Sequence, residues 1–423
     1  MPSKLKIGLS QSHTLGTREE TLSSLRATTQ EAALKGISIL LFPEAYLGGY
    51  PRTCNFGAAV GARTEHGRDQ FLAYTKSAVD LGDTPLGAGD DWLENKLPVN
   101  KETGRRGDGT REYLEDVARE TGVFIVTGAV EKAGGSLYCS ALYVDPIRGV
   151  IGKRRKVMPT GSERLVWAQG QASTLKAVVA NIKGVRVVMG CAICWENYMP
   201  LLRYAIYSQG VNLWLAPTAD ARDTWESLMK TVASEGRCFV LSANQAIKRK
   251  SLPEWITGVK TQETTSNAQG TNGHVQNPGL PNGTPKAVST GGRRRSMSMR
   301  TEENHEIAWR SKDGTINEEP ASEQAVVDGT ASAPATTSKL ASHGTTTEDG
   351  GEQFVSAGGS CIISPLGKTL EGPIWEKEHE LIYAEVDFDD CERGHLDFDA
   401  VGHYSRPDAF RLTVEGLDLN PPP

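Results

Sequence analysis

The sequence has few cysteines and no long apolar run. Its seven cysteines are an odd number spread along 423 residues, which argues against the closed disulfide framework of a small secreted protein. The first residues, Met-Pro-Ser-Lys-Leu-Lys, lack the apolar core of a secretory signal, and no run approaches the roughly 18 apolar residues of a membrane helix. We therefore expect a soluble, cytoplasmic protein with no membrane partner.

The chain also lacks a strong excess of either charge. It carries 46 lysines and arginines against 52 aspartates and glutamates, a formal net charge of −6 at pH 7. A general nucleic-acid binder would be basic, so we expect no nucleic-acid partner. No His-x-x-x-His spacing or Gly-rich phosphate loop is present. Cys191 and Cys194 form a single Cys-x-x-Cys without the second pair of a typical zinc site, which disfavours a metal.

One long segment is nearly free of aromatic residues. From Val259 to Gln353 the chain is rich in Thr, Ser, Gly, Asn, Pro and Glu, and its only aromatic residue is Trp309. Such a segment buries too little apolar surface to offset the entropy of ordering it, so we predict a disordered, low-complexity insertion over 259–353. The first part of the domain is then 1–258, with all candidate catalytic residues, and 354–423 supplies its C-terminal strands and tail.

The remaining sequence alternates strand and helix patterns. Thr17 and Glu20 form a capping box ahead of a helix that ends at Gly36. Helical patterns also occur at 200–209 and 224–236, and buried strands are predicted at 37–42, 123–130, 185–189, 211–216, 239–243, 361–364 and 381–386. This alternation indicates an α/β protein whose strands are mostly buried.

A carboxylate follows the strand predicted at 37–42. Glu44 stands in Phe-Pro-Glu-Ala-Tyr-Leu-Gly-Gly-Tyr-Pro, beyond the carboxyl end of that strand, where α/β sheets present their ligand sites. Apolar surroundings would raise its pKa toward that of a useful general base. The alternative is that Glu44 only caps a turn in a Gly/Pro-rich loop.

Four consecutive cations, Lys153 to Lys156, form the second candidate. Such a run is usually a solvated face. Here Pro-Thr-Gly-Ser-Glu-Arg follows and predicts a turn that carries a carboxylate, Glu163. A lysine held near two carboxylates stays charged, and a fixed ammonium can stabilise an oxyanion.

A cysteine stands at a predicted strand-to-helix elbow. The strand at 185–189 runs into Gly190, and a helix is predicted to begin near Pro200. Cys194 would feel the positive end of the helix beside unpaired N–H groups, which lowers the pKa of a thiol and favours a nucleophilic thiolate. The alternatives are a cysteine that only packs, or a Cys–His dyad with one of the histidines at 13, 66, 379, 395 and 403.

Together these stretches resemble the nitrilase branch of the carbon–nitrogen hydrolase superfamily. Residues 36–51 are similar to its N-terminal signature, residues 155–160 to its lysine motif, and residues 190–203, with Cys-Trp-Glu-Asn, to its cysteine signature. Residues 360–367 and 402–408 are similar to its C-terminal landmarks. Two positions depart from the pattern: Cys191, where a small residue or Gln is usual, and Arg154, where His is frequent.

The resemblance implies a four-layer α-β-β-α sandwich that forms a homodimer or a larger spiral homo-oligomer. It assigns Cys194 as nucleophile, Glu44 as general base and Lys156 as the cation. It further assigns Glu163 as the second carboxylate and the backbone N–H of Trp195 as an oxyanion donor, with no metal and no other cofactor. Our candidates for the substrate pocket are Tyr50 and Trp167, each of which could instead be a plain core aromatic.

The implied reaction is hydrolysis of a small-molecule nitrile to the carboxylic acid and ammonia, through a Cys thioimidate and an acyl-enzyme. Trp-Glu-Asn after the cysteine and Pro-Thr after the lysine favour the nitrilase branch over the amidase branch. Two alternatives stay open. One is an amidase-type hydrolase of a linear amide, and the other is an inactive scaffold that acts through the segment 259–353.

Overall fold

The structure is a computed structural model that describes residues 3–220, 222–257, 296–300, 306–310 and 351–423. The chain divides into two units: Met1–Gln262 with Thr347–Pro423, and Glu263–Thr346. The second unit therefore interrupts the sequence of the first. Its described residues form one antiparallel strand pair, β11 (Ser296–Arg300) and β12 (Glu306–Arg310), which the sequence did not predict. The rest of the predicted disordered segment lies almost entirely outside the described residues.

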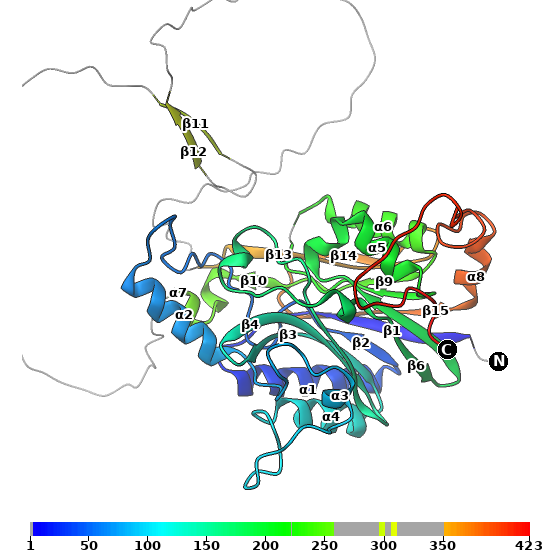
Figure 1. Ribbon diagram of the computed structural model, residues 1–423, viewed down its shortest axis with the longest axis horizontal. Coiled ribbons are helices and arrows are strands. Elements are labelled where there is room, and N and C mark those ends of the chain that lie inside the picture. The colour runs from blue at the N-terminus through cyan, green and yellow to red at the C-terminus, as the bar shows by residue number, and fades with distance from the viewer. Residues whose placement is uncertain (1–2, 221, 258–295, 301–305, 311–350) are drawn as a thin grey trace, which may run out of the picture. The chain divides into compact units, whose positions relative to one another are not determined.

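The first unit contains two β-sheets (Figure 1). The first sheet has the order β15-β1-β2-β3-β4-β5. Its strands β1, β2 and β3 are parallel to one another, whereas β15, β4 and β5 run antiparallel to their neighbours. The bounds are β1 (Lys4–Gln11), β2 (Ile39–Leu41), β3 (Phe124–Ala133), β4 (Ser136–Asp145), β5 (Gly149–Arg155) and β15 (Glu380–Asp387).

The second sheet has the order β10-β13-β9-β8-β7-β6, with β14 paired to β13. Strands β7, β8 and β9 are parallel, so their carboxyl ends lie at one edge of the sheet. The bounds are β6 (Val178–Ile182), β7 (Val185–Cys191), β8 (Leu213–Leu215), β9 (Phe239–Ser242), β10 (Ala246–Lys248), β13 (Phe354–Ile363) and β14 (Thr369–Trp375).

Helices cover the outer face of each sheet. Figure 1 shows α1 (Arg18–Leu34), α3 (Asp90–Leu93) and α4 (Thr110–Thr121) below the first sheet, and α5 (Pro200–Tyr207) and α6 (Trp225–Gly236) above the second. The remaining described helices are α2 (Glu65–Ser77), α7 (Glu254–Thr257), which packs against α2, and α8 (Asp389–His395). No helix of the described residues is long and apolar enough to cross a membrane.

Three apolar cores fill the spaces between these layers. In β2, Ile39 and Leu41 belong to the core that both sheets share, while Leu40 belongs to the core under α1 and α4. In β8, Leu213 faces the shared core and Trp214 the core under α5 and α6. Successive residues of a strand point to opposite faces, so a strand buried on both faces is apolar throughout. The four-layer α-β-β-α sandwich is confirmed.

The predicted elements are present with small shifts at their ends, except that the strand predicted at 361–364 begins seven residues earlier, as β13. The capping box of α1 is formed, because Glu20 N donates to Thr17 Oγ1 (3.1 Å) and Thr17 N donates to Glu20 Oε2 (2.9 Å). Gly36, with φ of +76°, follows the helix as its predicted stop. Strands β1, β4, β5, β6, β10 and β14 were not predicted; the last residues of β5 are cations rather than apolar side chains.

Candidate active site

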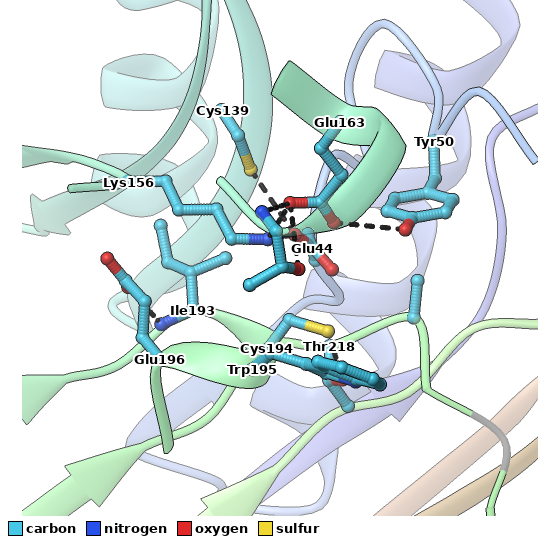
Figure 2. A network of polar contacts seen from close by, with 12 residues as sticks. Glu44, Tyr50, Cys139, Lys156, Glu163, Ile193, Cys194, Trp195, Glu196 and Thr218 are labelled. Carbon is cyan, nitrogen blue, oxygen red and sulfur yellow. Dashed lines mark hydrogen bonds and ion pairs between the residues drawn. The ribbon is translucent and has the colours of Figure 1, made fainter. Parts of the chain in front are cut away.

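Three strand ends bring the predicted site residues together. Glu44 follows β2 and Lys156 follows β5, both in the first sheet, and Cys194 follows β7 in the second. The two sheets pack face to face, so these ends meet in the space between them. Figure 2 shows the three side chains and Glu163 pointing toward one another.

The four consecutive cations are all buried, so the solvated-face alternative is wrong. Their side-chain exposures are 7%, 2%, 4% and 0% from Lys153 to Lys156. Lys153 and Arg155 lie on one face of the strand, where both form ion pairs with Glu131 (2.5 and 2.7 Å). Arg154 and Lys156 point to the opposite face, toward the second sheet. The alternation of a strand thus divides the run into two buried pairs.

Lys156 connects two carboxylates. Its Nζ donates to Glu44 Oε1 (2.8 Å) and to Glu163 Oε2 (2.7 Å), and its side chain is fully buried. Burial by itself would lower the pKa of Lys156, but Glu44, Cys194 and Glu163 together hold that pKa well above its ordinary value. A fixed ammonium therefore lies at the centre of the site.

Glu44 has the properties of a general base near neutral pH. Burial raises its pKa, Lys156 lowers it and Glu163 raises it, with a net pKa of about 6. Its Oε1 faces Lys156, whereas its Oε2 is buried and has no hydrogen bond among the described residues. The Cys194 side chain is a smaller influence that also lowers this pKa, so its sulfur lies near the carboxyl, while the thiol that contacts Glu44 Oε1 is that of Cys139 (3.6 Å). The backbone oxygen of Glu44 accepts from Gln245 Nε2 (2.6 Å).

Glu163 lies on the predicted turn, a 3₁₀ helix η1 (Gly161–Leu165). The N–H of Thr160 donates to Glu163 Oε2 (2.7 Å), the same oxygen that faces Lys156. Its Oε1 accepts from the hydroxyl of Tyr50 (3.0 Å). With its oxygens held by backbone, ammonium and phenol, Glu163 can orient Lys156 but is poorly placed to accept a proton.

The cysteine elbow is strained. Cys194 has φ of +53°, a conformation that costs energy for a residue with a side chain, and it begins a 3₁₀ helix η3 (Cys194–Tyr198). Asn197 holds the turn, because its Nδ2 donates to the backbone oxygens of Ala192 (2.8 Å) and Cys194 (2.7 Å). Helix α5 begins at Pro200 as predicted, but η3 separates it from the cysteine.

The prediction of a lowered thiol pKa is wrong. Burial, Glu44 and Glu163 hold the pKa of Cys194 well above its ordinary value, although Lys156 lowers it. The resting group is therefore a thiol that needs a base. Besides Lys156, the charged groups that act most strongly on it are carboxylates rather than a histidine, which leaves the Cys–His dyad without support.

Thr218 is a site residue that sequence reasoning missed. Its hydroxyl donates to Cys194 Sγ (3.2 Å). It follows β8, the parallel neighbour of β7, so both strands deliver a polar side chain to the same sheet edge. The Pro-Thr after the apolar run at 211–216 was the available signal.

The backbone N–H of Trp195 lies in the first turn of η3, where N–H groups have no acceptor within the helix. It can therefore donate to an oxyanion formed at the cysteine. Cys191 ends β7 and is buried, with a pKa raised by burial to about 11, so its thiol packs and stays protonated.

Both candidate pocket residues adjoin the site. The ring of Trp167 lies 5.4 Å from Lys156 Nζ and contacts Tyr50 edge-on, with 5.6 Å between the ring centres. Trp167 is almost fully buried, so it is a core aromatic that also contacts the cation. Tyr50, which bonds to Glu163, and Gln245, which bonds to the backbone oxygen of Glu44, line a small crevice together with Thr14, Gly49, Arg52, Ile247, Leu252, Pro253 and Ile256.

Within the described ranges, no group of three or more His, Cys, Asp or Glu side chains could hold a metal ion. The polar side chains at the site, Glu44, Lys156, Glu163 and Cys194, instead suit nucleophilic and acid–base chemistry on an uncharged electrophile.

Comparisons with known proteins agree with this geometry. The carbon-nitrogen hydrolase family model matches residues 6–267. The chain is 34% identical to a nitrilase of Bradyrhizobium diazoefficiens over 92% of this chain and 85% of that protein. It is 32% identical to an arylacetonitrilase of Trametes versicolor, over 98% of each chain, and 35% identical to nitrilase 3 of Arabidopsis thaliana, over 97% and 87%.

Among solved structures, a carbon-nitrogen hydrolase from Helicobacter pylori G27 matches with a TM-score of 0.54 and 14% identity, over 96% of this chain and 97% of that chain. This likeness concerns the fold alone. The family model and the relatives lead to one conclusion: the chain belongs to the carbon–nitrogen hydrolase family, in its nitrilase branch, and is a hydrolase of carbon–nitrogen bonds other than peptide bonds.

Proposed function

We propose that this enzyme is a nitrilase that converts an organic nitrile and two waters into a carboxylic acid and ammonia. One observation carries the proposal. A buried ammonium, Lys156, is bonded to Glu44 and Glu163, and the thiol of Cys194 lies on a strained elbow beside the same Glu44. That set can deprotonate a thiol, stabilise negative charge and exclude bulk water.

The first half of the reaction forms a thioimidate. Glu44 takes the proton of the Cys194 thiol, and the sulfur adds to the nitrile carbon as one π bond of the C≡N group breaks. The proton passes from Glu44 to the nitrile nitrogen. Lys156 and the N–H of Trp195 stabilise the negative charge that develops.

The second half releases ammonia and regenerates the thiol. Glu44 removes a proton from water, and hydroxide adds to the thioimidate carbon. Once its nitrogen is protonated, the tetrahedral intermediate expels ammonia and leaves a thioester on Cys194. A second water, activated in the same way, hydrolyses that thioester to the acid. If the tetrahedral intermediate expels the sulfur instead, the product is an amide.

Two features support a nitrile as substrate. The first is that the three relatives, whose similarity covers nearly the whole chain, are named nitrilase or arylacetonitrilase. The second feature is the sequence around two site residues, because Trp-Glu-Asn after Cys194 and Pro-Thr after the lysine motif favour the nitrilase branch over the amidase branch.

The test is ammonia release from a panel of aliphatic, aryl and arylacetonitriles, with the acid:amide product ratio measured on each hit. Cys194→Ala should abolish release. Cys361→Ala removes an equally buried thiol from the core under α6 and should leave release unchanged. Ammonia from amides alone would establish the amidase alternative, and no release from either panel would favour the inactive scaffold.

The homodimer or larger homo-oligomer and the cytoplasmic location also stay proposals. Sedimentation of the purified chain tests the first, and a monomer at micromolar concentration would contradict it. Fractionation of the producing cells tests the second.

A further inference from the structure

One buried carboxylate, that of Glu196, contacts both the backbone after Lys156 and the backbone before Cys194. Glu196 Oε1 accepts from the backbone N–H of Val157 (2.7 Å) and Met158 (3.1 Å), and its Oε2 accepts from the N–H of Ile193 (2.8 Å). Figure 2 shows Glu196 bonded to Ile193 next to the catalytic cluster. Arg154 Nη2 also donates to Oε2 (2.5 Å). Glu196 is therefore at the junction of two segments.

Those two segments carry the cation and the nucleophile. Val157 directly follows Lys156, and Ile193 directly precedes Cys194. The first segment leaves β5 in one sheet and the second leaves β7 in the other, so no shared strand ladder fixes the spacing between them. Contacts between side chains and backbone must set it.

From these contacts, and on the basis of the proposed function, we infer that Glu196 is a positioning residue, held in place by Arg154. It keeps the ammonium of Lys156 at the correct separation from the sulfur of Cys194. A charged acceptor suits this task because charge-assisted hydrogen bonds are shorter and stronger than neutral ones. A displacement of about 1 Å at a reacting centre can cost ~100-fold in rate.

Arg154 supplies the balancing charge. Its side chain is 2% exposed and the Glu196 side chain is fully buried, so neither can rely on water. A guanidinium remains charged throughout the working pH range, so the ion pair between Arg154 and Glu196 persists as Glu44 titrates. Arg154 reaches Glu196 because it lies on the same face of β5 as the position of Lys156, two residues further on.

The decisive variant is Glu196→Gln, with Glu131→Gln as the matched control. Glu131 is equally buried and binds Lys153 and Arg155 on the opposite face of β5, but it makes no described contact with the cysteine segment. We expect Glu196→Gln to lower kcat by about 100-fold with KM little changed. Glu131→Gln should retain kcat, even if it lowers the free energy of unfolding in urea by as much as Glu196→Gln does.

A second measurement does not depend on nitrile turnover. The rate of alkylation of Cys194 by iodoacetamide, followed by mass spectrometry of its peptide, reports the ease of forming the thiolate at each pH. In Glu196→Gln the alkylation profile should move to higher pH, because Lys156 is no longer held near the sulfur. If the wild type hydrolyses no nitrile, this shift still tests the inference separately from the proposed function.

Arg154→Met and Arg154→Lys complete the test and cover a Glu196→Gln variant that fails to fold. The methionine variant should show the lowered kcat and the shifted alkylation profile, and the lysine variant should recover most of both. The inference is overturned if Glu131→Gln loses as much kcat as Glu196→Gln. An unchanged alkylation profile in both Glu196→Gln and Arg154→Met would overturn it as well.

Discussion

Removing the buried ammonium tests the electrostatic reasoning most directly. In the wild type, Lys156 Nζ lies 2.8 Å from Glu44 Oε1 and 2.7 Å from Glu163 Oε2. In Lys156→Met both carboxylates lose this shared partner and stay buried. Breaking a buried pair from one side costs about 3–5 kcal/mol of unfolding free energy. The carboxyls can escape part of this cost by binding a proton.

Because a carboxyl binds a proton, the loss of unfolding free energy in the variant depends on pH, and the sign of that dependence is known. The pKa of Glu44 is already raised to about 6, and Lys156 is its largest lowering influence, so the variant pKa should lie higher still. Above pH 6 the folded variant then holds up to one proton more than either the unfolded chain or the folded wild type. Its stability should therefore fall, relative to the wild type, by up to about 1.4 kcal/mol for each pH unit gained.

Urea unfolding at pH 6, 7 and 8, followed by tryptophan fluorescence, measures this difference. Lys153→Met is the matched control, because it removes a buried lysine from the other face of the same strand, where Arg155 remains beside Glu131. Lys156→Met should also lose about 10²- to 10³-fold in kcat, as loss of one oxyanion donor does elsewhere. A stability difference that does not change with pH would refute the electrostatic coupling between Glu44 and Lys156.

Three further outcomes follow from the site. The kcat/KM of the wild type should fall about tenfold per pH unit below pH 6, since the pKa of Glu44 is about 6 and only its ionised form accepts the thiol proton; a flat profile from pH 5 to 7 would contradict this assignment. Tyr50→Phe should lower kcat/KM by roughly 10- to 150-fold, because the bond to the charged Glu163 is worth about 1.5–3 kcal/mol. Unaltered kinetics would show that this phenol does not orient the carboxylate. Thr218→Val should shift alkylation of Cys194 to higher pH because the thiolate loses a hydrogen-bond donor, and an unshifted profile would remove Thr218 from the site.

The local features of this chain were readable from its sequence. The capping box at Thr17, the buried strand before Glu44 and the helix start at Pro200 depend on neighbours within a few residues. Periodicity and capping act at that range, so the alternation of strand and helix was predicted without coordinates.

The features that depend on contacts between distant segments could not be predicted from the sequence. Neither the burial of all four cations at 153–156 nor the thiol pKa of Cys194 follows from nearby residues, because both depend on what the opposite sheet brings against them. Thr218 and Gln245 were missed for the same reason: their partners, Cys194 and Glu44, are distant in the chain.

The sequence alone therefore determined which chemical groups this protein has, and that Glu44 and Cys194 follow buried strands. The tertiary structure decided which of those groups touch, which carboxylate oxygen stays open to a proton, and that the nucleophile rests as a thiol. Burial and Coulomb interaction depend on distance in space, and the packing of two separate sheets sets that distance.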